Sequence, residues 1–396
     1  MKISRVVLIL SFVSLLADIA SELLYPIMPI YLKSIGYSFV AIGLLEGLAN
    51  VVAGVAKGYF GKLSDKRGER SVFVKTGYGF SVIGKGLLLI SSTLPIIYIS
   101  RLTDRLGKGI RTAPRDAILA VESTEETRAA VFGFHRAMDT TGAVIGPLIG
   151  LFWLNYYPGD YKGMFLIAVL PALGSWLLTL LVKDSSLQLK PIPTDSKKGG
   201  FFSHFGYWKI ATVEYKSLVG TLILFALVNS PDVFLLLTIK AAGFSDQAMI
   251  GSYIFYNLIY ALLSYPIGKL ADNIGRQKVL IVGILLFFVT YCGMAYSTSL
   301  IAFVVLFMVY AISMACTESV VKAIIAGLIP SKESGTALGF YASTTSIAAL
   351  LAGAWTGWMF EEYGIKAAFL VTAIGAFIAM TILIVKTKNF SKKDIL

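Results

Sequence analysis

The chain has 396 residues, of which 56% are hydrophobic and only 15% are charged, and its net charge is +12. A soluble domain carries about 25% charged residues, so this composition excludes one and favours a polytopic helical membrane protein. A nucleic-acid-binding protein is also disfavoured, because the basic residues lie in short loops between apolar runs.

The apolar runs of the chain predict a series of membrane-spanning helices. A helix needs about 20 residues to cross a bilayer. We predict twelve spans, at residues 6–32, 39–60, 72–92, 95–118, 129–153, 162–182, 216–240, 247–267, 279–298, 300–328, 335–359 and 364–386. The first starts like a signal peptide, but no small-residue cleavage site follows it, so we interpret it as an uncleaved span.

One long polar stretch separates these spans into two sets. Residues 183–215 are rich in Pro, Gly and Lys, a composition typical of a linker. The predicted fold is an all-α polytopic membrane protein whose twelve transmembrane helices form two pseudo-symmetric six-helix bundles. The N-terminal bundle is predicted over 1–182, a cytoplasmic linker over 183–215 and the C-terminal bundle over 216–396.

The Lys and Arg residues predict the orientation in the membrane. They gather in the loop at 61–70, in the linker, after the eighth span and at the C-terminus, whereas the opposite loops carry only isolated Lys residues. Because basic loops stay in the cytoplasm, both termini are predicted to be cytoplasmic. The predicted location is the cell membrane (inner or plasma membrane), which the chain crosses many times.

The two bundles are related by an internal repeat. The string GKLSDKRGER begins at Gly61 and GKLADNIGRQK begins at Gly268, an offset of 207 residues. VFGF ends at Phe134 and ALGF ends at Phe340, an offset of 206 residues. Two matches at nearly one offset indicate duplication. Paired six-helix repeats with a substrate site between them are a transporter architecture.

The repeated loop resembles the signature of the major facilitator superfamily, G-x-L-a-D-r-x-G-r-[RK]. The matching residues are Gly61, Leu63, Asp65, Gly68 and Arg70 in the first copy and Gly268, Leu270, Asp272, Gly275 and Arg276 in the second. Glu69 departs from the pattern. The resemblance implies gate loops, in which glycines allow a tight turn and the Asp caps a helix start and pairs with an Arg. The alternative is a basic turn that only sets the topology.

Two further motifs resemble sequences of the same superfamily. The antiporter-like motif in the fifth span consists of Gly142, Gly146, Pro147 and Gly150. Leu151 replaces its last Gly, and small residues at this spacing also serve ordinary helix packing. In the fourth span, Arg105 falls on an arginine that the resemblance associates with proton coupling, although Lys108 replaces the usual polar residue.

Ionisable residues inside the predicted spans are candidates for function, because each costs about 2.5–3.5 kcal/mol to insert. Asp18 and Glu22 lie one helical turn apart in the first span. Two carboxyl groups at that spacing resist being ionised together, which suits a proton carrier. The alternative is that each is a static partner of Lys85 or Arg101. The residues predicted to handle protons are thus Asp18, Glu22 and, by the resemblance, Arg105.

Other polar and aromatic side chains of the spans are predicted to line a cavity of mixed charge. They are Tyr25, Glu46, Lys85, Arg101, Asp104, Arg136, Asp139, Asp232, Tyr256, Asn257, Glu318 and Lys322. For Asp104 the alternative is a local pair with Lys108 in its own helix. For Arg136 it is a pair with Asp139, and aromatic residues at such positions more often serve packing than ligand contact.

These features together predict a secondary active transporter rather than an enzyme. The antiporter-like span favours proton-coupled export of a small ionisable organic compound by alternating access. The alternatives are proton-coupled uptake, export of a divalent metal ion on carboxylate ligands, and a non-transporting receptor on the same fold. We expect no cofactor, resident metal or nucleic-acid partner. The predicted partners are a small molecule, protons and the lipid bilayer, and the predicted oligomeric state is a monomer.

Overall fold

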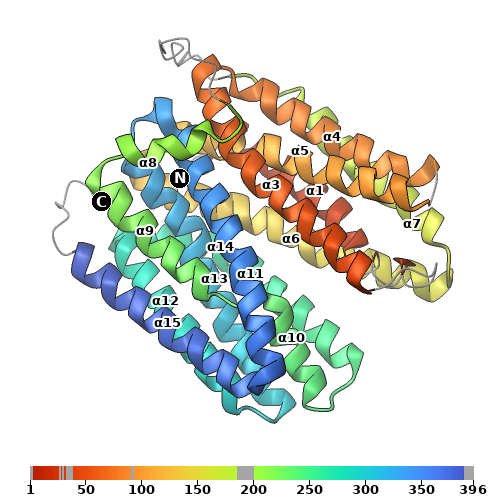
Figure 1. Cartoon of the computed structure of the whole chain (residues 1–396). Coiled ribbons are helices and arrows are strands. Elements are labelled where there is room, and N and C mark those ends of the chain that lie inside the picture. Colours follow the sequence, from red (N-terminus) through yellow and green to blue (C-terminus); the bar gives the residue numbers. More distant parts are fainter. Residues whose placement is uncertain are drawn as a thin grey trace. The chain divides into compact units, whose positions relative to one another are not determined.

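The structure is a computed structural model of the chain (Figure 1). It describes residues 3–25, 28, 31–32, 39–90, 93–184 and 200–387. The side chains of residues 39–48, 50, 94, 246, 247 and 387 lie outside this description. Every regular element among the described residues is a helix.

The long helices follow the predicted spans closely. They are α1 (Arg5–Leu24), α3 (Phe39–Arg67), α4 (Arg70–Ile90), α5 (Leu94–Val121), α6 (Arg128–Tyr156), α7 (Tyr161–Thr179), α9 (Val213–Val228), α10 (Asp232–Ala241), α11 (Asp246–Ile274), α12 (Arg276–Tyr296), α13 (Leu300–Gly327), α14 (Ser334–Glu362) and α15 (Gly364–Thr387). The short ones are η1 (Glu125–Thr127), η2 (Ser203–Gly206), α8 (Tyr207–Ile210) and η3 (Ser331–Glu333).

A multi-pass helical membrane protein is thereby confirmed. In the described part of the chain, 10 helical segments are long and apolar enough to cross a membrane. The helices α3 and α5 have the length but are not among them. For α5 the reason lies in its sequence, which places charged residues on most of its turns. The number of twelve spans stays a prediction.

The seventh predicted span is interrupted in the structure. α9 ends at Val228, and α10 begins only at Asp232. Pro231 lies between them, and it disfavours a continuous helix because it has no N–H and its ring crowds the preceding turn. The break places the Asp232 carboxylate at the first residue of a helix, where the helix dipole favours negative charge.

Turn and cap residues explain where several helices begin. Gly68 and Gly275, at the two repeated loops, have φ angles of 70° and 105°, a region that favours glycine. This confirms the predicted tight turns of the two loops. Ser4 accepts a hydrogen bond from the Val7 N–H at 3.2 Å and so caps α1. Ser299 caps α13 in the same way, accepting from Ala302 N at 3.2 Å.

Contacts divide the chain into two compact units. The first unit consists of Met1–Glu122, Met138–Tyr207 and Pro330–Ser343, and the second of Ser123–Ala137, Trp208–Ile329 and Thr344–Leu396. Two helices belong to both, since α6 begins in the second unit and α14 begins in the first. The predicted bundle boundaries follow the sequence order alone and stay a prediction.

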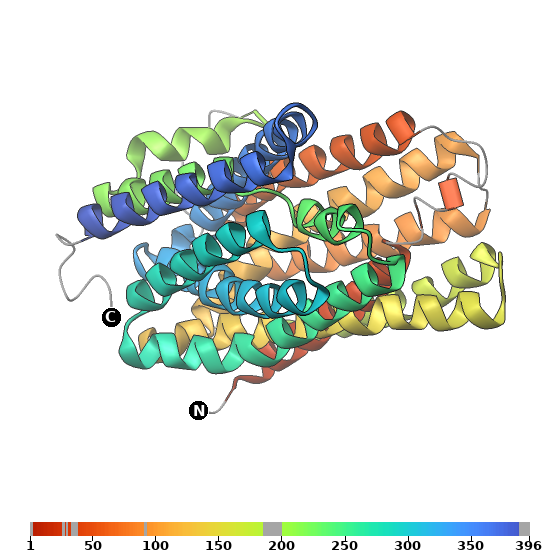
Figure 2. The same cartoon turned by 90° about the horizontal axis from the view of Figure 1, so that it is seen from below.

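Each unit packs its own helices in the same pattern. In the first, α5 packs against α3 and α4, and α7 packs against α4 and α1 (Figures 1 and 2). In the second, α13 packs against α11 and α12, and α15 packs against α12 and α9. The two patterns correspond helix for helix, as a duplication requires.

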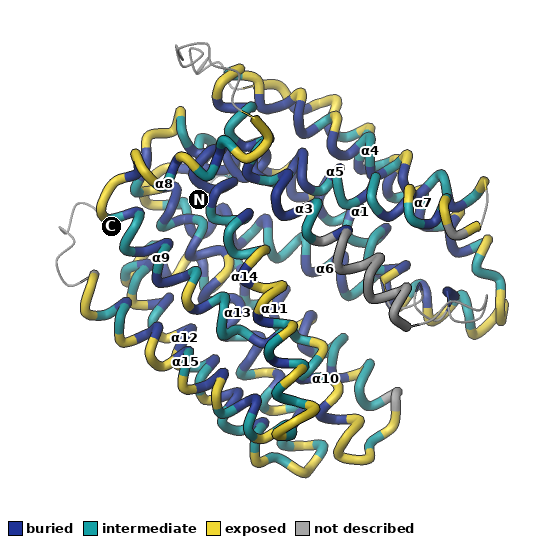
Figure 3. Tube along the Cα trace, in the orientation of Figure 1, coloured by how far each residue is buried: buried dark blue, intermediate teal, exposed yellow. Residues whose placement is uncertain are grey.

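Burial in each unit is that of a protein surrounded by lipid. One apolar cluster of the first unit joins Leu24, Leu88 and Phe165 from three helices. Large apolar side chains also lie on the outside, as the exposed positions along α15 in Figure 3 show. Val385 and Ile301 are 62% and 78% exposed. Such outer faces are stable in hydrocarbon, which solvates apolar side chains well.

Candidate functional site

The glycine motif of α6 brings that helix against α1. A Cβ atom at Gly142 would lie 2.6 Å from the Leu15 carbonyl oxygen and 2.8 Å from the Asp18 Cβ. A Cβ at Gly146 would lie 2.7 Å from the Leu23 nitrogen. These positions therefore have to be glycine for the backbones to approach this closely. The close contact falls on the two turns of α1 that carry Asp18 and Glu22.

Glu22 is the acid at the centre of this region. Its Oε2 atom is buried and has no hydrogen-bond partner among the described residues. The carboxyl group lies within electrostatic range of Lys108, Arg105 and Arg101 of α5 and of Asp139 of α6. The structure thus gathers three bases and a second acid around it, all within the first unit. These residues were predicted as site residues, apart from Lys108, which the sequence marked only as a departure from a motif.

The charged face of α5 has partners on α4. Lys85 and Asp104 form an ion pair of 2.6 Å, and their side chains are only 5% and 10% exposed. Among the described residues this pair stands in place of the local Asp104–Lys108 pair that was the alternative. It also assigns Lys85 a partner other than the acids of α1. Ser100, one turn before Asp104, donates to the Gly84 carbonyl at 2.6 Å and ties the two helices together.

A chain of polar contacts links α1, α5 and α6. Ser14 donates a hydrogen bond to Asp139. Arg115 donates to the Ser14 hydroxyl at 3.1 Å and forms an ion pair with Asp116 at 3.0 Å. Ser14 was missed from the sequence, although it lies four residues before Asp18 on the same face of α1. The alternative considered for Asp139 was a pair with Arg136, and the sequence did not indicate its contact with Ser14.

The second unit holds a different polar group. Arg136 forms an ion pair with Glu318 of α13 at 2.7 Å and donates to the Tyr260 hydroxyl at 2.8 Å. Its guanidinium also lies over the Tyr260 ring, 5.1 Å from the centroid. The Arg136 and Glu318 side chains are 32% and 44% exposed. This ion pair is therefore accessible, unlike the Lys85–Asp104 pair.

Aromatic side chains surround Asp232 in the same unit. Tyr310 donates its hydroxyl proton to Asp232 at 2.6 Å. Its ring stacks on Tyr256, with centroids 5.3 Å apart. Asn257 donates to the Tyr253 carbonyl of its own helix at 3.0 Å. Tyr256 and Asn257 are both buried, so in this structure they pack the unit rather than face open space.

Three remaining predicted cavity residues are placed less centrally or not at all. Tyr25 follows the end of α1 and is 47% exposed. Lys322 is half-buried on α13, one turn beyond Glu318. The Glu46 side chain lies outside the described residues. Within the described part of the chain, no group of three or more His, Cys, Asp or Glu is arranged to hold a metal ion.

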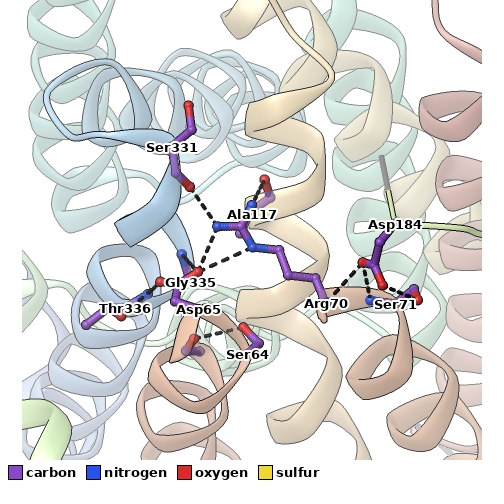
Figure 4. Close-up of polar contacts among 10 residues, drawn as sticks. Ser64, Asp65, Arg70, Ser71, Ala117, Asp184, Ser331, Gly335 and Thr336 are labelled. Carbon is purple, nitrogen blue, oxygen red and sulfur yellow. Dashed lines mark hydrogen bonds and ion pairs between the residues drawn. The ribbon is translucent and has the colours of Figure 1, made fainter. Parts of the chain in front are cut away.

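The first repeated loop makes a helix cap, which Figure 4 shows. Asp65 forms an ion pair with Arg70 at 2.7 Å and accepts hydrogen bonds from Gly335 N at 3.2 Å, Thr336 N at 2.6 Å and the Thr336 hydroxyl at 2.8 Å. Arg70 in turn donates to the Ser331 carbonyl at 2.7 Å. We call these five residues the α3–α14 latch.

The second loop repeats this arrangement on another pair of helices. Asp272 forms an ion pair with Arg276 at 2.8 Å and accepts from Ala129 N at 3.0 Å and Ala130 N at 2.8 Å. Arg276 donates to the Glu125 carbonyl. We call these five residues the α11–α6 latch. In both latches an acid binds the N–H groups of the second and third residues of a helix, where backbone donors lack partners.

Glycines let the capped helices approach. A Cβ at Gly61 would overlap the Gly335 carbonyl oxygen and lie 2.9 Å from the Ala113 Cβ. A Cβ at Gly268 would overlap the Ala129 carbonyl oxygen. The first Gly of each repeated motif is therefore required by the closeness of two backbones.

Comparisons with known sequences identify relatives along the whole chain. A family model described as Major Facilitator Superfamily matches residues 10–256 and 245–395. An uncharacterised MFS-type transporter of Methanocaldococcus jannaschii is 33% identical over 369 residues, which cover 91% of this chain and 89% of that protein. The multidrug resistance protein MdtG of Citrobacter koseri is 24% identical over 281 residues, covering 68% of this chain and 67% of that protein.

Solved structures share the fold. The human organic anion transporter MFSD10 matches with a TM-score of 0.81 at 16% identity, covering 96% of this chain and 99% of that one. The fucose:proton symporter FucP of E. coli matches with a TM-score of 0.76 at 15% identity, covering 96% and 98%. At these identities the likeness concerns the fold alone.

Proposed function

Since the chain belongs to the Major Facilitator Superfamily of membrane transporters, we propose that it exports a small ionisable organic compound in exchange for protons. Members of this superfamily are transporters and not enzymes. The proposal adds to this a direction, a coupling ion and a set of residues. The multidrug resistance protein MdtG, similar over 68% of this chain, supports the export direction.

The observation that carries the proposal is the environment of Glu22. A buried carboxylate oxygen with no hydrogen-bond partner is costly when it is charged. The nearby cations Lys108 and Arg105 offset that cost only while they stay close. A ligand or a movement that displaces these cations therefore changes whether Glu22 holds a proton. This is the coupling that a proton-driven transporter needs.

Exchange, rather than co-transport, follows if substrate and proton compete for the same acids. A cationic group of the substrate that binds Glu22 or Asp18 excludes the proton from that carboxyl group. Binding of one then weakens binding of the other, and alternation between the two drives exchange. The glycines of α6 that seat α1 support this role, because they hold both acids against a rigid helix.

The two latches supply the moving parts of the proposal. Each fixes the first turn of one helix by an acid on another, within a single unit. We propose that alternating access breaks and reforms these contacts while two six-helix bundles, 1–182 and 216–396, move as bodies around the linker 183–215. In the proposed orientation both termini and the latches are cytoplasmic in the cell membrane, and the transporter is a monomer.

Purified protein in liposomes loaded with a pH-sensitive dye tests this function. The probes are ethidium, benzalkonium and benzoate, added outside one at a time. Exchange predicts that at least one probe raises the internal pH as protons leave, and that Glu22→Gln abolishes the change. Glu361→Gln, an exposed acid at the end of α14, is the matched control and should behave like wild type.

Each other outcome is decisive about the coupling. Internal acidification by a probe that protein-free liposomes do not show would indicate co-transport and overturn export by exchange. A Glu22→Gln protein that still moves protons with the probe would remove Glu22 from the mechanism. Absence of any probe-dependent flux in the wild type, in the presence of probe binding, would favour a receptor.

A further inference from the structure

The end of the linker forms a short ordered segment on the first unit. η2 and the first residue of α8 follow directly on Phe201 and Phe202, and η2 packs against α3. We call Phe201–Tyr207 the strap. The segment lies within the linker 183–215, but the proposed transport function assigns no role to its individual contacts. Asp65 of the α3–α14 latch interacts electrostatically with Tyr207 at its end.

His204 is the buried centre of the strap. The residue is 0% exposed, and both ring nitrogens have partners. Nδ1 lies 3.1 Å from the Phe201 carbonyl oxygen, and Nε2 lies 3.1 Å from the hydroxyl of Ser343 on α14. Because a carbonyl oxygen only accepts, Nδ1 carries the proton, and Nε2 accepts from Ser343. This pattern is complete with a neutral imidazole.

A notch in α3 receives the ring. A Cβ atom at Gly58 would overlap the His204 imidazole. On the other side, Gly339 of α14 lies so near that its Cβ would be 2.7 Å from the Lys57 carbonyl oxygen. The ring therefore sits beside a close approach of α3 and the start of α14, and it contacts both.

Other contacts hold the rest of the strap on the same two helices. Lys62 of α3 donates to the Ser203 carbonyl at 2.9 Å. The ring centroids of Phe201 and Tyr59 of α3 are 5.1 Å apart. The ring centroid of Phe340 on α14 lies 6.2 Å from that of Phe205 and 6.4 Å from that of Tyr207. The strap thus bridges α3 and α14 about two turns along α3 from Asp65 of the latch.

We propose that the strap is a proton-sensitive fastener: with His204 neutral it ties α14 to α3, and a proton on His204 releases it. The proposal concerns how the contact between α3 and the start of α14 is regulated. It goes beyond transport itself, since it holds whatever compound or coupling ion the chain uses.

The electrostatics of the seat give the proposal its sign. Burial lowers the pKa of His204 below its ordinary value of 6.5; the hydrogen bond to the Phe201 carbonyl opposes this shift in part, and the positive charge of Lys62 adds to it. On α3, Lys57 adjoins Gly58 in the sequence and Lys62 acts on the imidazole, whereas Asp65 and Glu333 of η3 interact with Tyr207. α14 contributes the uncharged Ser343 and Phe340 here. A protonated His204 would be buried beside a cation, and leaving the notch relieves that cost.

Hydrogen–deuterium exchange of the purified full-length protein in detergent tests the strap. Peptides over residues 201–210 and 334–343 are followed at about pH 7.5 and about pH 5.5, after correction for the intrinsic exchange rate. Release predicts that both regions exchange about fivefold faster or more at the lower pH. A peptide from α12 should not change and reports that the fold is intact. Equal protection of the strap at the two pH values would overturn the proposal.

Three variants separate the causes. His204→Gln, which stays neutral, should remove the pH dependence; a pH dependence equal to that of wild type would assign it to another group and overturn the proposal. Gly58→Ala should open the strap already at about pH 7.5, because the added methyl group occupies the seat of the ring. Gly86→Ala is the matched control, since a Cβ there meets nothing within 4 Å. A Gly58→Ala protein with wild-type protection would also contradict the proposed seat.

Discussion

The two latches have the same plan but differ in the number of hydrogen bonds that their acids accept. In both, an acid at the end of a long helix caps the second and third residues of another helix and pairs with an Arg. Only the α3–α14 latch adds a side-chain donor, the Thr336 hydroxyl, to its acid. The equivalent position in the α11–α6 latch is Ala130, which offers none. The duplication thus kept the charge and the backbone geometry and changed the number of hydrogen bonds.

Further hydrogen bonds surround the α3–α14 latch and add to the difference between the two latches. Asp184 accepts from the N–H groups of Arg70 and Ser71 at 3.0 and 2.8 Å and so caps α4 beside the latch. Arg70 also donates to the Ala117 carbonyl of α5 at 3.3 Å. The strap adds contacts to the same two helices. In the proposed alternating-access movement, the latch with fewer hydrogen bonds should open first, which predicts that the α11–α6 latch opens before the α3–α14 latch.

The largest expected effect comes from removing the charge of each acid. Asp65→Asn leaves Arg70 buried without its counter-ion, which costs about 3–5 kcal/mol. Asp272→Asn should destabilise the protein less than Asp65→Asn does. The difference should be about 1.5–3 kcal/mol, the contribution of one hydrogen bond to a charged group, because Asp272 accepts no bond like that from the Thr336 hydroxyl. The two ion pairs are equally buried, so burial does not explain a difference. Thermal unfolding of both variants in detergent measures the order.

A double variant separates the charge from the fold. Asp65→Asn combined with Arg70→Met removes both charges and should recover part of the lost stability. Equal unfolding midpoints for Asp65→Asn and Asp272→Asn would contradict the inequality of the latches.

Removing the Thr336 hydroxyl from one latch, or adding a hydroxyl at Ala130 of the other, should make the stabilities of the two latches more alike. Thr336→Val keeps the shape but loses the hydroxyl bond to Asp65, at an expected cost of about 1.5–3 kcal/mol. Ala130→Ser places a hydroxyl at the equivalent position near Asp272 and should raise the stability of that latch. Differential scanning fluorimetry of the two variants and their combination is the measurement. A Thr336→Val protein as stable as wild type would show that the hydroxyl bond contributes nothing.

The glycines test what the latches share. Gly61→Ala and Gly268→Ala each drive a methyl group into a backbone carbonyl, with an expected cost of about 1–3 kcal/mol. Because both methyl groups meet a backbone carbonyl oxygen, both variants should be destabilised, with the larger effect at Gly61, where the Ala113 Cβ also lies close. Gly86→Ala, in open space, should be neutral or slightly stabilising. A large effect at Gly61 alone would mean that the close approach of backbones is not common to both loops.

The sequence predicted these features to different degrees. Helix positions followed from apolar runs, because one span is a local property of about 20 residues. The Asp–Arg pairs of the latches were within reach too, since both partners lie in one loop. The break at Pro231 did not follow from the proline alone, because Pro114, Pro147, Pro171 and Pro266 lie inside helices. The length of the fourth apolar run predicted a span, although the charged residues of α5 make it too polar to be among the helices that meet the criteria for a span.

Long-range pairing was beyond the sequence. Lys85 reaches Asp104 on the next helix, and Arg136 reaches Glu318 on α13. Local spacing favoured i, i+3 and i, i+4 partners, which are visible in one sequence, whereas these partners depend on how helices pack. The seat of His204 depends on packing as well, since Gly58 and Ser343 belong to helices far apart in the chain.

The smallest expected effect is a pH dependence that only the first latch and its strap should show. The pKa of His204 is lowered on folding from the ordinary value of 6.5. Below about pH 6.5 the unfolded chain therefore binds a proton that the folded chain does not, so the stability contributed at neutral pH is lost as the pH falls. The loss is at most about 1.4 kcal/mol for each pH unit in that window. Unfolding midpoints of wild type should thus fall more steeply between about pH 7.5 and about pH 5.5 than those of His204→Gln. Coincident slopes would mean that the imidazole keeps its place when charged, which the burial of the ring and the nearby Lys62 both oppose.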